Sequence, residues 1–514
     1  MNFQSKENYM KYCKRIALTL LAMLSVAMVS AQDITIKAGE KGNSKGYQPT
    51  MIVIDKADAE GRYYSVEPDL NAFSKVKGVM VREVDMDYKE YQKVAIANTK
   101  GNGIMHVQRD GTKMHLVLSN YDDKRLTLRH VCVDLASFAV VSDSMLVDIM
   151  EKKGDFFYHW DGTSASGNYY GLVYANVNEK AGTADVQAML FDRSMRRQWT
   201  QGIALSAIAD IFVTDDGRIA LGGYSNGDGR SDGAMLEFAI TTATGTRRGR
   251  HTSVYKLGSM ALLNCIGDKV LATALETDRG TGWAGSFNAG AVVTTGTVYT
   301  GCASYLFDVA EDRMAGSDRR TFSRDDARVF YNASLVSEIA SPDINFLSLR
   351  ASTPTSYGGA ALYGRNWHEK VVQGNGMSSE TYYFKGMMVF AADSTGRFTW
   401  VRPVMHDNGT GGIGPERTES DLVAEGDKVY LFTNESDGDA DSYDSEKPAR
   451  KAVMKAHGAV SAYIFSPDGN VVKRKIKTDG MNIITTPLRR QSPGVYTFVS
   501  GAQKGHVSEI TVKP

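Results

Sequence analysis

An acidic segment near the C-terminal end of the chain has residue types and spacing suited to a cation: NESDGDADSYDSE at 434–446. Its carboxylates alternate as the oxygen ligands of calcium-binding loops do, where clustered oxygens replace the hydration shell of the ion. The EF-hand pattern is incomplete, because Ser442 stands where Gly is required and Pro448 where the bidentate Glu belongs. A solvated acidic loop is therefore favoured over a calcium site, and no other cofactor is indicated. The carboxylates concerned are Asp437, Asp439 and Asp441.

Aromatic and acidic residues gather in polar loops that follow apolar runs of the sequence. Aromatic rings with a polar handle suit ligands that have both apolar and polar faces, such as sugars, and loops on a rigid scaffold concentrate function. We expect these loops to form one ligand-binding rim for a glycan, peptide or protein. The rim candidates are Trp283, Phe287, Trp367, His368, Glu369, Tyr382, Tyr383, Tyr443, Asp228 and Asp232, with Asp122, Asp123 and Asp278 beside them.

Two histidines, His159 in YHWDG and His368 in NWHEK, have Trp and acidic neighbours and are candidates for ligand contact. Three others, His106, His115 and His130, fall within one repeat unit and are interpreted as structural residues.

The sequence contains no HExxH, no P-loop and no CxxC pair. With 59 acidic and 59 basic residues, neither a carboxylate pair for glycoside hydrolysis nor an arginine cluster for holding a carboxylate can be selected from the sequence. No catalytic residue is therefore assigned.

A repeat positions the candidate loops. The stretch 208–240 consists of an apolar run, an Asp-Asp-Gly turn, a second apolar run, a polar loop and a third apolar run, and six further stretches have the same order. Apolar runs bounded by Gly, Asp and Asn turns are typical of short buried strands. The second strands are expected at 113–125, 168–180, 218–230, 269–280, 358–370, 428–439 and 494–505, and the third strands at 128–136, 184–192, 233–240, 302–309, 386–393, 459–466 and 506–513.

The spacing of these units predicts an all-β fold, a β-propeller with seven blades within about 102–514, because four-stranded blades repeat at about 40–50 residues. Six or eight blades are also compatible, since the segments 67–101 and 310–345 diverge from the repeat. Separate β-sandwich domains are the main alternative fold. The last unit ends after its third strand, so we expect residues within 33–66 to pair beside 506–513 and close the ring.

The beginning of the chain has the composition of a signal peptide, with a basic region, the apolar run IALTLLAMLSVAMV and small residues before Gln32. The apolar run is shorter than the roughly 20 residues that span a bilayer. The sequence therefore predicts a signal peptide over 1–31, a propeller domain over 32–514 and no transmembrane anchor in the mature chain. The protein is expected in the periplasm, at the cell surface or outside the cell.

The charge of the chain argues against a nucleic-acid partner, and its cysteines leave open whether a disulfide forms. The formal charge is 0, and removing 1–31 takes away four basic residues and one acidic residue, which leaves about −3. A nucleic-acid partner is not expected, because the chain has no basic excess. Cys265 and Cys302 fall in one predicted blade and are compatible with a disulfide, while three buried thiols, Cys132 included, are the alternative.

The array of units resembles the secreted β-propeller proteins of Gram-negative bacteria, many of which have no assigned function. That resemblance covers about 100–514 and implies a propeller fold without a catalytic motif. The segment 462–513 is also similar to the C-terminal sorting domain of type IX secretion cargo, through its DGNVV and PGVY. It lacks the usual Asn-Pro start and fits two propeller units, which is the favoured interpretation.

Together these features favour an exported, non-catalytic binding or scaffold protein. The alternative is a propeller hydrolase or lyase that acts on extracellular glycans.

Overall fold

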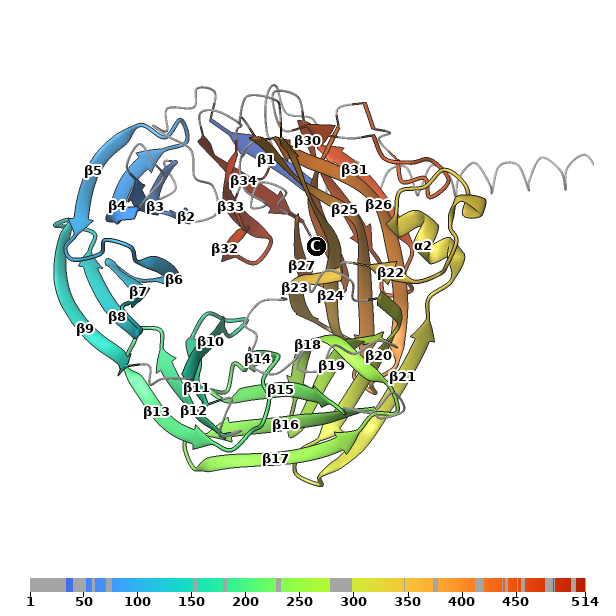
Figure 1. Cartoon of the computed structure of the whole chain (residues 1–514). Helices are drawn as coiled ribbons and strands as arrows, with labels where there is room; N and C mark the ends of the chain where they lie inside the picture. The colour runs from blue at the N-terminus through green and yellow to red at the C-terminus, as the bar shows by residue number, and fades with distance from the viewer. Residues whose placement is uncertain are drawn as a thin grey trace, which may run out of the picture.

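The chain forms eight blades around a central channel, an all-β propeller (Figure 1). Within the residues that this computed structural model describes, no helix combines the length and apolar character needed to cross a membrane. The described residues are 34–39, 52–57, 61–70, 76–150, 155–178, 183–227, 233–277, 298–345, 347–372, 378–411, 420–436, 438–439, 442–450, 452–453, 458–476, 484, 486–500 and 505–513.

Each of the first four blades is an antiparallel meander whose first strand lies at the channel and whose fourth lies at the outer edge. The blades are β2 (Val53–Lys56), β3 (Arg62–Leu70), β4 (Val76–Asp85) and β5 (Glu90–Ile96); β6 (Gly103–Asp110), β7 (Lys113–Asp122), β8 (Arg125–Asp134) and β9 (Ala139–Met150); β10 (Asp155–Thr163), β11 (Tyr169–Asn178), β12 (Thr183–Asp192) and β13 (Arg197–Ile203); and β14 (Asp210–Val213), β15 (Ile219–Asn226), β16 (Ala234–Thr242) and β17 (Gly245–Thr252).

The other four blades follow the same plan with additions at their edges. A short α2 (Arg324–Phe330), η2 (Val336–Glu338) and β22 (Ile344–Asn345) connect blades five and six, and β29 (Ala452–Val453) pairs with β26 in parallel. The blades are β18 (Lys256–Ile266), β19 (Lys269–Thr277), β20 (Val298–Asp308) and β21 (Arg313–Thr321); β23 (Leu347–Thr355), β24 (Gly358–Val372), β25 (Ser378–Asp393) and β26 (Phe398–Gly411); β27 (Ser420–Glu425), β28 (Lys428–Ser436), β30 (Gly458–Phe465) and β31 (Val471–Ile476); and β32 (Arg489–Ser492), β33 (Val495–Ser500), β34 (His506–Val512) and β1 (Ile34–Ala38).

The blade count corrects the favoured prediction of seven to eight. All seven predicted pairs of second and third strands form, and the additional blade is β2–β5, which precedes them. Its apolar pattern is interrupted by charged residues that neutralise one another, since Arg82 pairs with Glu67 and Glu90, and Arg62 pairs with Glu83 at 3.1 Å. Such paired charges can occupy a sheet without the continuous apolar run that marks the other blades.

Ring closure is confirmed in part. The strand β1 pairs antiparallel with β34, from Ile34 opposite Val512 to Ala38 opposite Ser508. In Figure 1 the first strand therefore lies beside the last, blue next to red. The rest of the predicted closing segment 33–66 has another role, because β2 and the start of β3 belong to the first blade.

Buried apolar side chains fill the space between every pair of neighbouring blades. Eight clusters of buried residues occur among the described residues, one for each of the eight contacts around the ring. The cluster between blades eight and one is the smallest, with six buried residues that include Tyr63 and Val499. Because each blade is held mainly by its neighbours, stability depends on all eight contacts.

The disulfide between Cys265 and Cys302, which the sequence left open, does not form. Cys132, Cys265 and Cys302 are all free thiols in the described structure. Cys265 lies on β18 and Cys302 on β20, and the whole of β19 separates those two strands.

Candidate functional site

A cavity of about 1560 Å³ opens at one end of the central channel. It is lined by the first strands of blades one, two, three, six, seven and eight, and by the turns that follow them. We call this end of the channel the channel mouth. Its charged lining residues are Asp55, Lys56, Arg109, Arg193, Asp215, Asp421, Arg489, Arg490 and Glu509.

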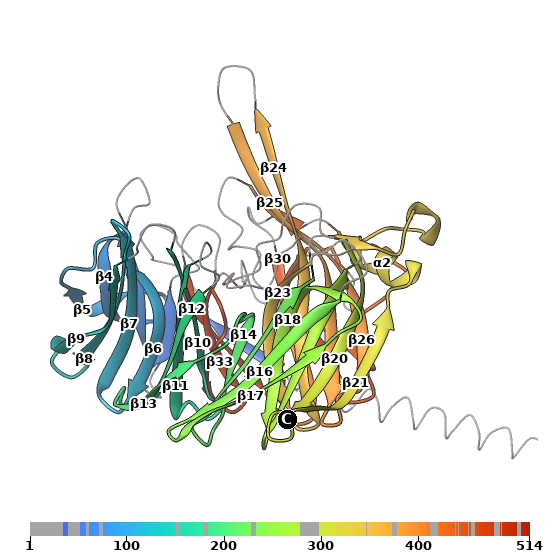
Figure 2. The same cartoon turned by 60° about the horizontal axis from the view of Figure 1, so that its bottom comes forward.

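The channel mouth faces away from the predicted ligand-binding rim. The turns between first and second strands, such as 109–111 and 163–167, line the mouth. The connections between second and third strands leave the opposite end of each second strand, because neighbouring strands are antiparallel. The hairpin of β24 and β25, one of those connections, projects from that opposite face in Figure 2. Two different surfaces are therefore available for binding.

Three arginines from different places in the chain converge at the channel mouth. Arg109 lies on β6 of blade two, and its Nη1 donates to the carbonyl oxygens of Lys56 at 2.5 Å and Ala57 at 3.2 Å in blade one. Arg193, in the turn after β12, donates from Nε to the carbonyl of Arg109 at 3.3 Å. Arg489 on β32 of blade eight donates from Nη2 to the carbonyl of Val107 in blade two at 2.5 Å.

These three guanidinium groups bond to backbone carbonyls, and no ion pair joins them to any carboxylate of the described residues. The Nε of Arg489 is buried and has no hydrogen-bond partner there. Burial lowers the pKa of Arg489, and the charge of Asp55 opposes that effect. Burying a guanidinium whose donors make no hydrogen bonds is unfavourable in free energy. An anionic ligand would supply the missing acceptors, so the arrangement favours binding of an anion.

Asp55 is the carboxylate that the three arginines surround electrostatically. Burial raises its pKa, while Arg489, Arg109 and Arg193 act in the opposite direction and the net shift is upward. Protonation of Asp55 would leave the positive charge of the arginines uncompensated. The electrostatic potential of the mouth therefore depends on this one carboxyl group.

His106 forms part of the wall near Arg489. Its ring stacks on Tyr170 with centroids 4.0 Å apart, and its Nε2 lies 3.1 Å from Oε1 of Gln108. The amide of Gln108 in turn donates to the carbonyl of Gly167. Burial and the nearby Arg489 lower the pKa of His106 to about 3, so its imidazole is neutral at ordinary pH. Both the ring and the amide are committed to contacts within the wall.

The remaining charged groups of the mouth are occupied. Lys56 pairs with Glu509 at 2.7 Å, and Arg490 pairs with Glu425 at 3.3 Å. Asp421 accepts from the backbone N–H groups of Leu422 and Leu488, each at 2.9 Å. Burial raises the pKa of Asp421 to about 6. The uncommitted positive charge of the mouth therefore belongs to Arg109, Arg193 and Arg489.

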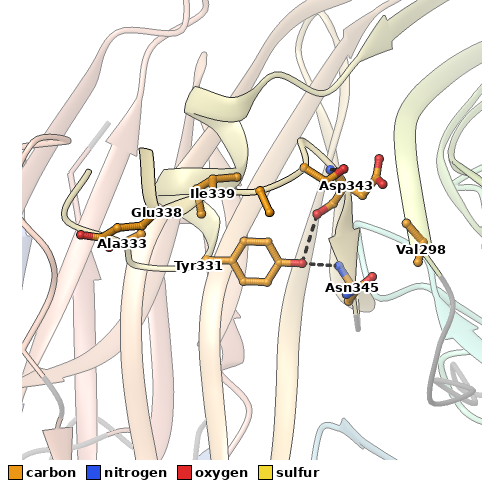
Figure 3. Close-up of a pocket in the computed structure, with 9 residues that line it drawn as sticks. Val298, Tyr331, Ala333, Glu338, Ile339, Asp343 and Asn345 are labelled. Atoms are coloured by element: carbon orange, nitrogen blue, oxygen red, sulfur yellow. Dashed lines mark hydrogen bonds between the residues drawn. The ribbon is translucent and has the colours of Figure 1, made fainter. Parts of the chain in front are cut away.

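A second, shallower pocket of about 480 Å³ lies beside the connection between blades five and six (Figure 3). The hydroxyl of Tyr331 occupies its floor, where it donates to the carbonyl of Asp343 at 3.2 Å and accepts from the N–H of Asn345 at 2.7 Å. Both contacts join parts of one connection, so Tyr331 serves to hold the segment after α2 in place.

Many predicted rim residues cannot be placed, because they lie outside the described residues or their side chains do. The first group is Asp228, Asp232, Asp278, Trp283 and Phe287, and two candidate calcium ligands, Asp437 and Asp441, also lie outside the described residues. The second group has a described backbone in the hairpin of β24 and β25, where Trp367 is opposite Tyr383, His368 is opposite Tyr382, and Glu369 is opposite Thr381. Their side chains remain undescribed, and their roles remain predictions.

One rim candidate, Tyr443, and one candidate calcium ligand, Asp439, are described and take part in the fold. The ring of Tyr443 packs edge-on against Tyr463, and its hydroxyl donates to the carbonyl of Pro403 at 3.0 Å. Asp439 accepts from the backbone N–H groups of Arg450 at 2.7 Å and Ser436 at 3.2 Å. Within the described residues no three His, Cys, Asp or Glu side chains gather in a way that could hold a metal ion.

The other candidates occupy turns and walls. Asp122 and Asp123 lie in the tight turn between β7 and β8, where Asp123 has a φ of 46°. His115 and His130 contact each other inside blade two, with Nδ1 and Nε2 2.9 Å apart. His159 is half-buried on β10, and burial lowers its pKa.

Sequence reasoning missed the arginines of the channel mouth. Arg109 stands in the turn signal RDG and Arg489 begins the strand β32, and some 380 residues of sequence separate them. Only the ring topology brings them together. Only their position near the end of a first strand could have indicated these arginines in the sequence. Every turn at this mouth shares that position, so it does not single them out.

Comparisons with known proteins agree with the fold and go no further. No protein-family model matches the chain, and no curated protein matches it. The β-propeller domain of the Trilobed protease from Pyrococcus furiosus matches at 8% identity and a TM-score of 0.34, over 84% of this chain and 97% of that one. Drosophila Semaphorin 2a matches at 9% identity and a TM-score of 0.33, over 90% of this chain and 95% of that one.

The acylaminoacyl peptidase of Pyrococcus horikoshii matches at 11% identity and a TM-score of 0.33, over 68% of this chain and 44% of that one. This chain thus corresponds to less than half of that peptidase. Identities and TM-scores at this level carry no evidence about ligand or activity.

Proposed function

We propose that this chain is an exported, non-catalytic binding protein whose rigid propeller holds a polar ligand in the channel mouth. One observation carries the proposal: guanidinium groups from three separate segments converge, without carboxylate partners among the described residues, on a cavity of about 1560 Å³. Ligand sites of about 300–1,000 Å³ hold small molecules, so this cavity has room for several sugar or amino-acid units.

The protonation and hydrogen bonding of the side chains that could transfer a proton favour binding over catalysis. A general acid or base must reach the substrate with a proton to give or accept. His106 is neutral and engaged in stacking with Tyr170, and both oxygens of Asp421 accept from backbone N–H groups. These groups serve the wall of the cavity.

One observation favours the alternative, a hydrolase acting on extracellular glycans. The pKa of Asp421 is raised to about 6 by burial, and a carboxylic acid that holds its proton near neutral pH is a feature of glycosidase general acids. The two functions differ in their product, since only the hydrolase releases reducing ends.

A glycan array and a reducing-sugar assay, both performed on residues 32–514, separate the two functions. We expect retention of a subset of glycans and no reducing ends above the blank. Release of sugar that Asp421→Asn abolishes would establish the hydrolase and contradict the proposal. Failure to retain any glycan would refute glycan binding and leave a peptide or protein ligand for a parallel peptide array.

A further inference from the structure

We infer that the arginine cluster formed by Arg109, Arg193 and Arg489 selects acidic saccharides and binds the carboxylate of a uronate unit. The inference rests on the proposed function and goes beyond it by naming the ligand class and the residues that recognise it. The site is distinct from the connections between second and third strands, which leave the opposite ends of the second strands.

The charge of the cluster requires an anion. The three guanidinium groups lie near the carboxylate of Asp55, and none of them forms an ion pair with a carboxylate of the described residues. Arg489 is largely removed from water, and its buried Nε has no partner among the described residues. Truly structural buried arginines have their donors satisfied, because an unpaired buried charge is strongly destabilising. The unused donor therefore points to a missing acceptor.

The shape of the donors favours a carboxylate. A guanidinium presents parallel N–H groups whose spacing matches the two oxygens of a carboxylate, and such pairs are stronger than neutral hydrogen bonds. The three arginines and one ionised Asp55 carry a net positive charge, which a bound carboxylate reduces.

The rest of the cavity wall favours a saccharide as the carrier of that carboxylate. Hydroxyl and amide side chains line it, and these groups exchange hydrogen bonds with sugar hydroxyls. Two aromatic rings line it: that of His106 stacks on Tyr170, and that of Tyr496 is buried with its hydroxyl donating to Glu425. The polar lining side chains are Gln108, Thr163, Ser164, Ser166, Ser352, Thr353, Gln491 and Ser492.

The cluster also joins the blades beside the smallest apolar contact of the ring. Arg109 connects blade two to blade one, and Arg489 connects blade eight to blade two. A ligand held by both would bridge these blades and stabilise the native state in proportion to its occupancy. Binding should therefore raise the melting temperature, and that readout does not depend on any activity.

Calorimetric titration of residues 32–514 with a galacturonic acid trisaccharide tests the inference, with its methyl ester as the uncharged match. We expect the acid to bind at least about tenfold more tightly than the ester. Arg193→Gln should weaken binding of the acid about tenfold, because this exposed residue contributes a charge-assisted hydrogen bond without supporting the core. Asp55→Asn should act in the opposite direction and tighten binding about threefold by removing a like charge.

Arg197→Gln is the matched control. Arg197 is an exposed arginine four residues from Arg193, on the outermost strand β13, and its replacement should change the affinity less than about twofold. Far-UV circular dichroism and melting temperatures of the free variants establish that all of them fold. In the parent chain the acid should raise the melting temperature, and in Arg193→Gln that rise should shrink.

Equal binding of acid and ester, or unchanged affinity in Arg193→Gln, would overturn the inference while leaving a glycan-binding function intact. Binding of inorganic phosphate or an acidic peptide with no binding of the acid would overturn it in favour of another anion. Retention of no glycan of any kind would refute glycan binding itself, and the inference with it.

Discussion

Two half-buried aspartates each join a pair of neighbouring blades through backbone hydrogen bonds. Asp210, at the start of β14 in blade four, accepts from the N–H of Ile211 and from that of Leu262 in blade five, each at 2.8 Å. Asp421, at the start of blade seven, accepts from Leu422 and from Leu488, just before blade eight. In both cases a carboxyl group satisfies backbone donors that the radial splay of first strands leaves without ladder partners.

The ionisation of Asp210 should make stability depend on pH. Burial raises its pKa from 3.8 to about 7, so the native state binds more protons than the unfolded state between those values. The stabilisation is complete below pH 3.8 and is lost as the pH rises through about 7. We expect the parent to lose a few kcal/mol relative to Asp210→Asn between pH 5 and pH 8, at about 1.4 kcal/mol per pKa unit.

Urea unfolding of both chains at the two pH values provides the measurement. Buried His106 and His406, each with a pKa lowered to about 3, act in the opposite direction but equally in both chains, so the difference cancels their effect. A difference between parent and variant that stays constant with pH would show that Asp210 does not change its protonation in this range.

Gly386 is the residue at which α2 docks onto blade six. Its φ is +71°, and a Cβ built there would lie 1.6 Å from the carbonyl oxygen of Phe330, the last residue of α2. Gly386→Ala should therefore cost at least about 3 kcal/mol, since both the backbone conformation and the contact are violated. Gly111→Ala is the control, because its φ is +61° with open space around it, and about 1 kcal/mol is expected.

Both glycine variants are compared by thermal unfolding. Equal losses of stability for Gly386→Ala and Gly111→Ala would mean that α2 moves to accommodate the added methyl group and does not pack tightly against β25.

At the level of elements, one sequence pattern identifies how a blade engages the next. FDRSMRRQW and ADSTGRFTW each place an Asp seven residues before a Trp. Asp192 accepts from the N–H of Arg196 at 2.9 Å, and Asp393 from that of Thr395 at 2.8 Å, so each Asp shapes the turn into the outer strand. The tryptophans that follow, Trp199 and Trp400, are buried against the next blade.

We expect substitution of Trp400 to lower the stability of the protein more than substitution of Trp199. Its ring stacks on Phe465 of blade seven with centroids 5.0 Å apart and an interplanar angle of 10°. We expect Trp400→Ala to lower stability by about 3–5 kcal/mol, as large-to-small changes in a core do, and Trp400→Phe to lower it less because stacking is retained. Chemical unfolding of the three chains measures this. Similar losses in both variants would mean that burial of the indole, and not stacking, holds the two blades together.

The middle strands were the predictable part of the fold, and the reason is burial on two faces. The strand β19 is buried at nearly every position and appears in the sequence as the continuous apolar run KVLATAL. The strand β4 is covered as well, but Arg82 and Glu83 interrupt its apolar run, and their partners Glu67, Glu90 and Arg62 come from other strands. A pattern of single residues cannot show that two distant charges cancel, so this blade was missed.

The arginine cluster could not be predicted from the sequence, because it depends on the closure of the whole ring. Lys56 and Glu509 form an ion pair across the ring closure although 453 residues separate them. Ring closure brings blade eight beside blades one and two, and the distance along the chain between Arg109 and Arg489 carries no information about it. The seven repeat units, in contrast, could be recognised one at a time.

Ring closure through β1 should govern the stability of the whole propeller. A chain that begins at residue 40 lacks β1, which leaves the backbone of β34 unpaired and removes Ile34 and Ile36 from the contact between blades seven and eight. We expect this chain to melt at least about 5 °C below residues 32–514 and to aggregate through the exposed edge.

The matched control for that deletion is Thr35→Ala, which keeps the backbone of β1 and changes one exposed side chain. It should melt like the parent. Differential scanning calorimetry and light scattering compare the three chains, and a deleted chain that melts with the parent and stays monodisperse would show that the strand adds nothing to the ring.

The pairing of β1 with β34 also imposes an order on biosynthesis. The ribosome makes β1 among the first residues of the fold and its partner β34 among the last. Blades one to seven can assemble on neighbours already made, as repeat units do, whereas blade eight has to wait until the ribosome has made β34. For that whole interval the nascent chain carries an unpaired first strand and an open ring, and a chaperone that shields this strand would protect the molecule at its most vulnerable time.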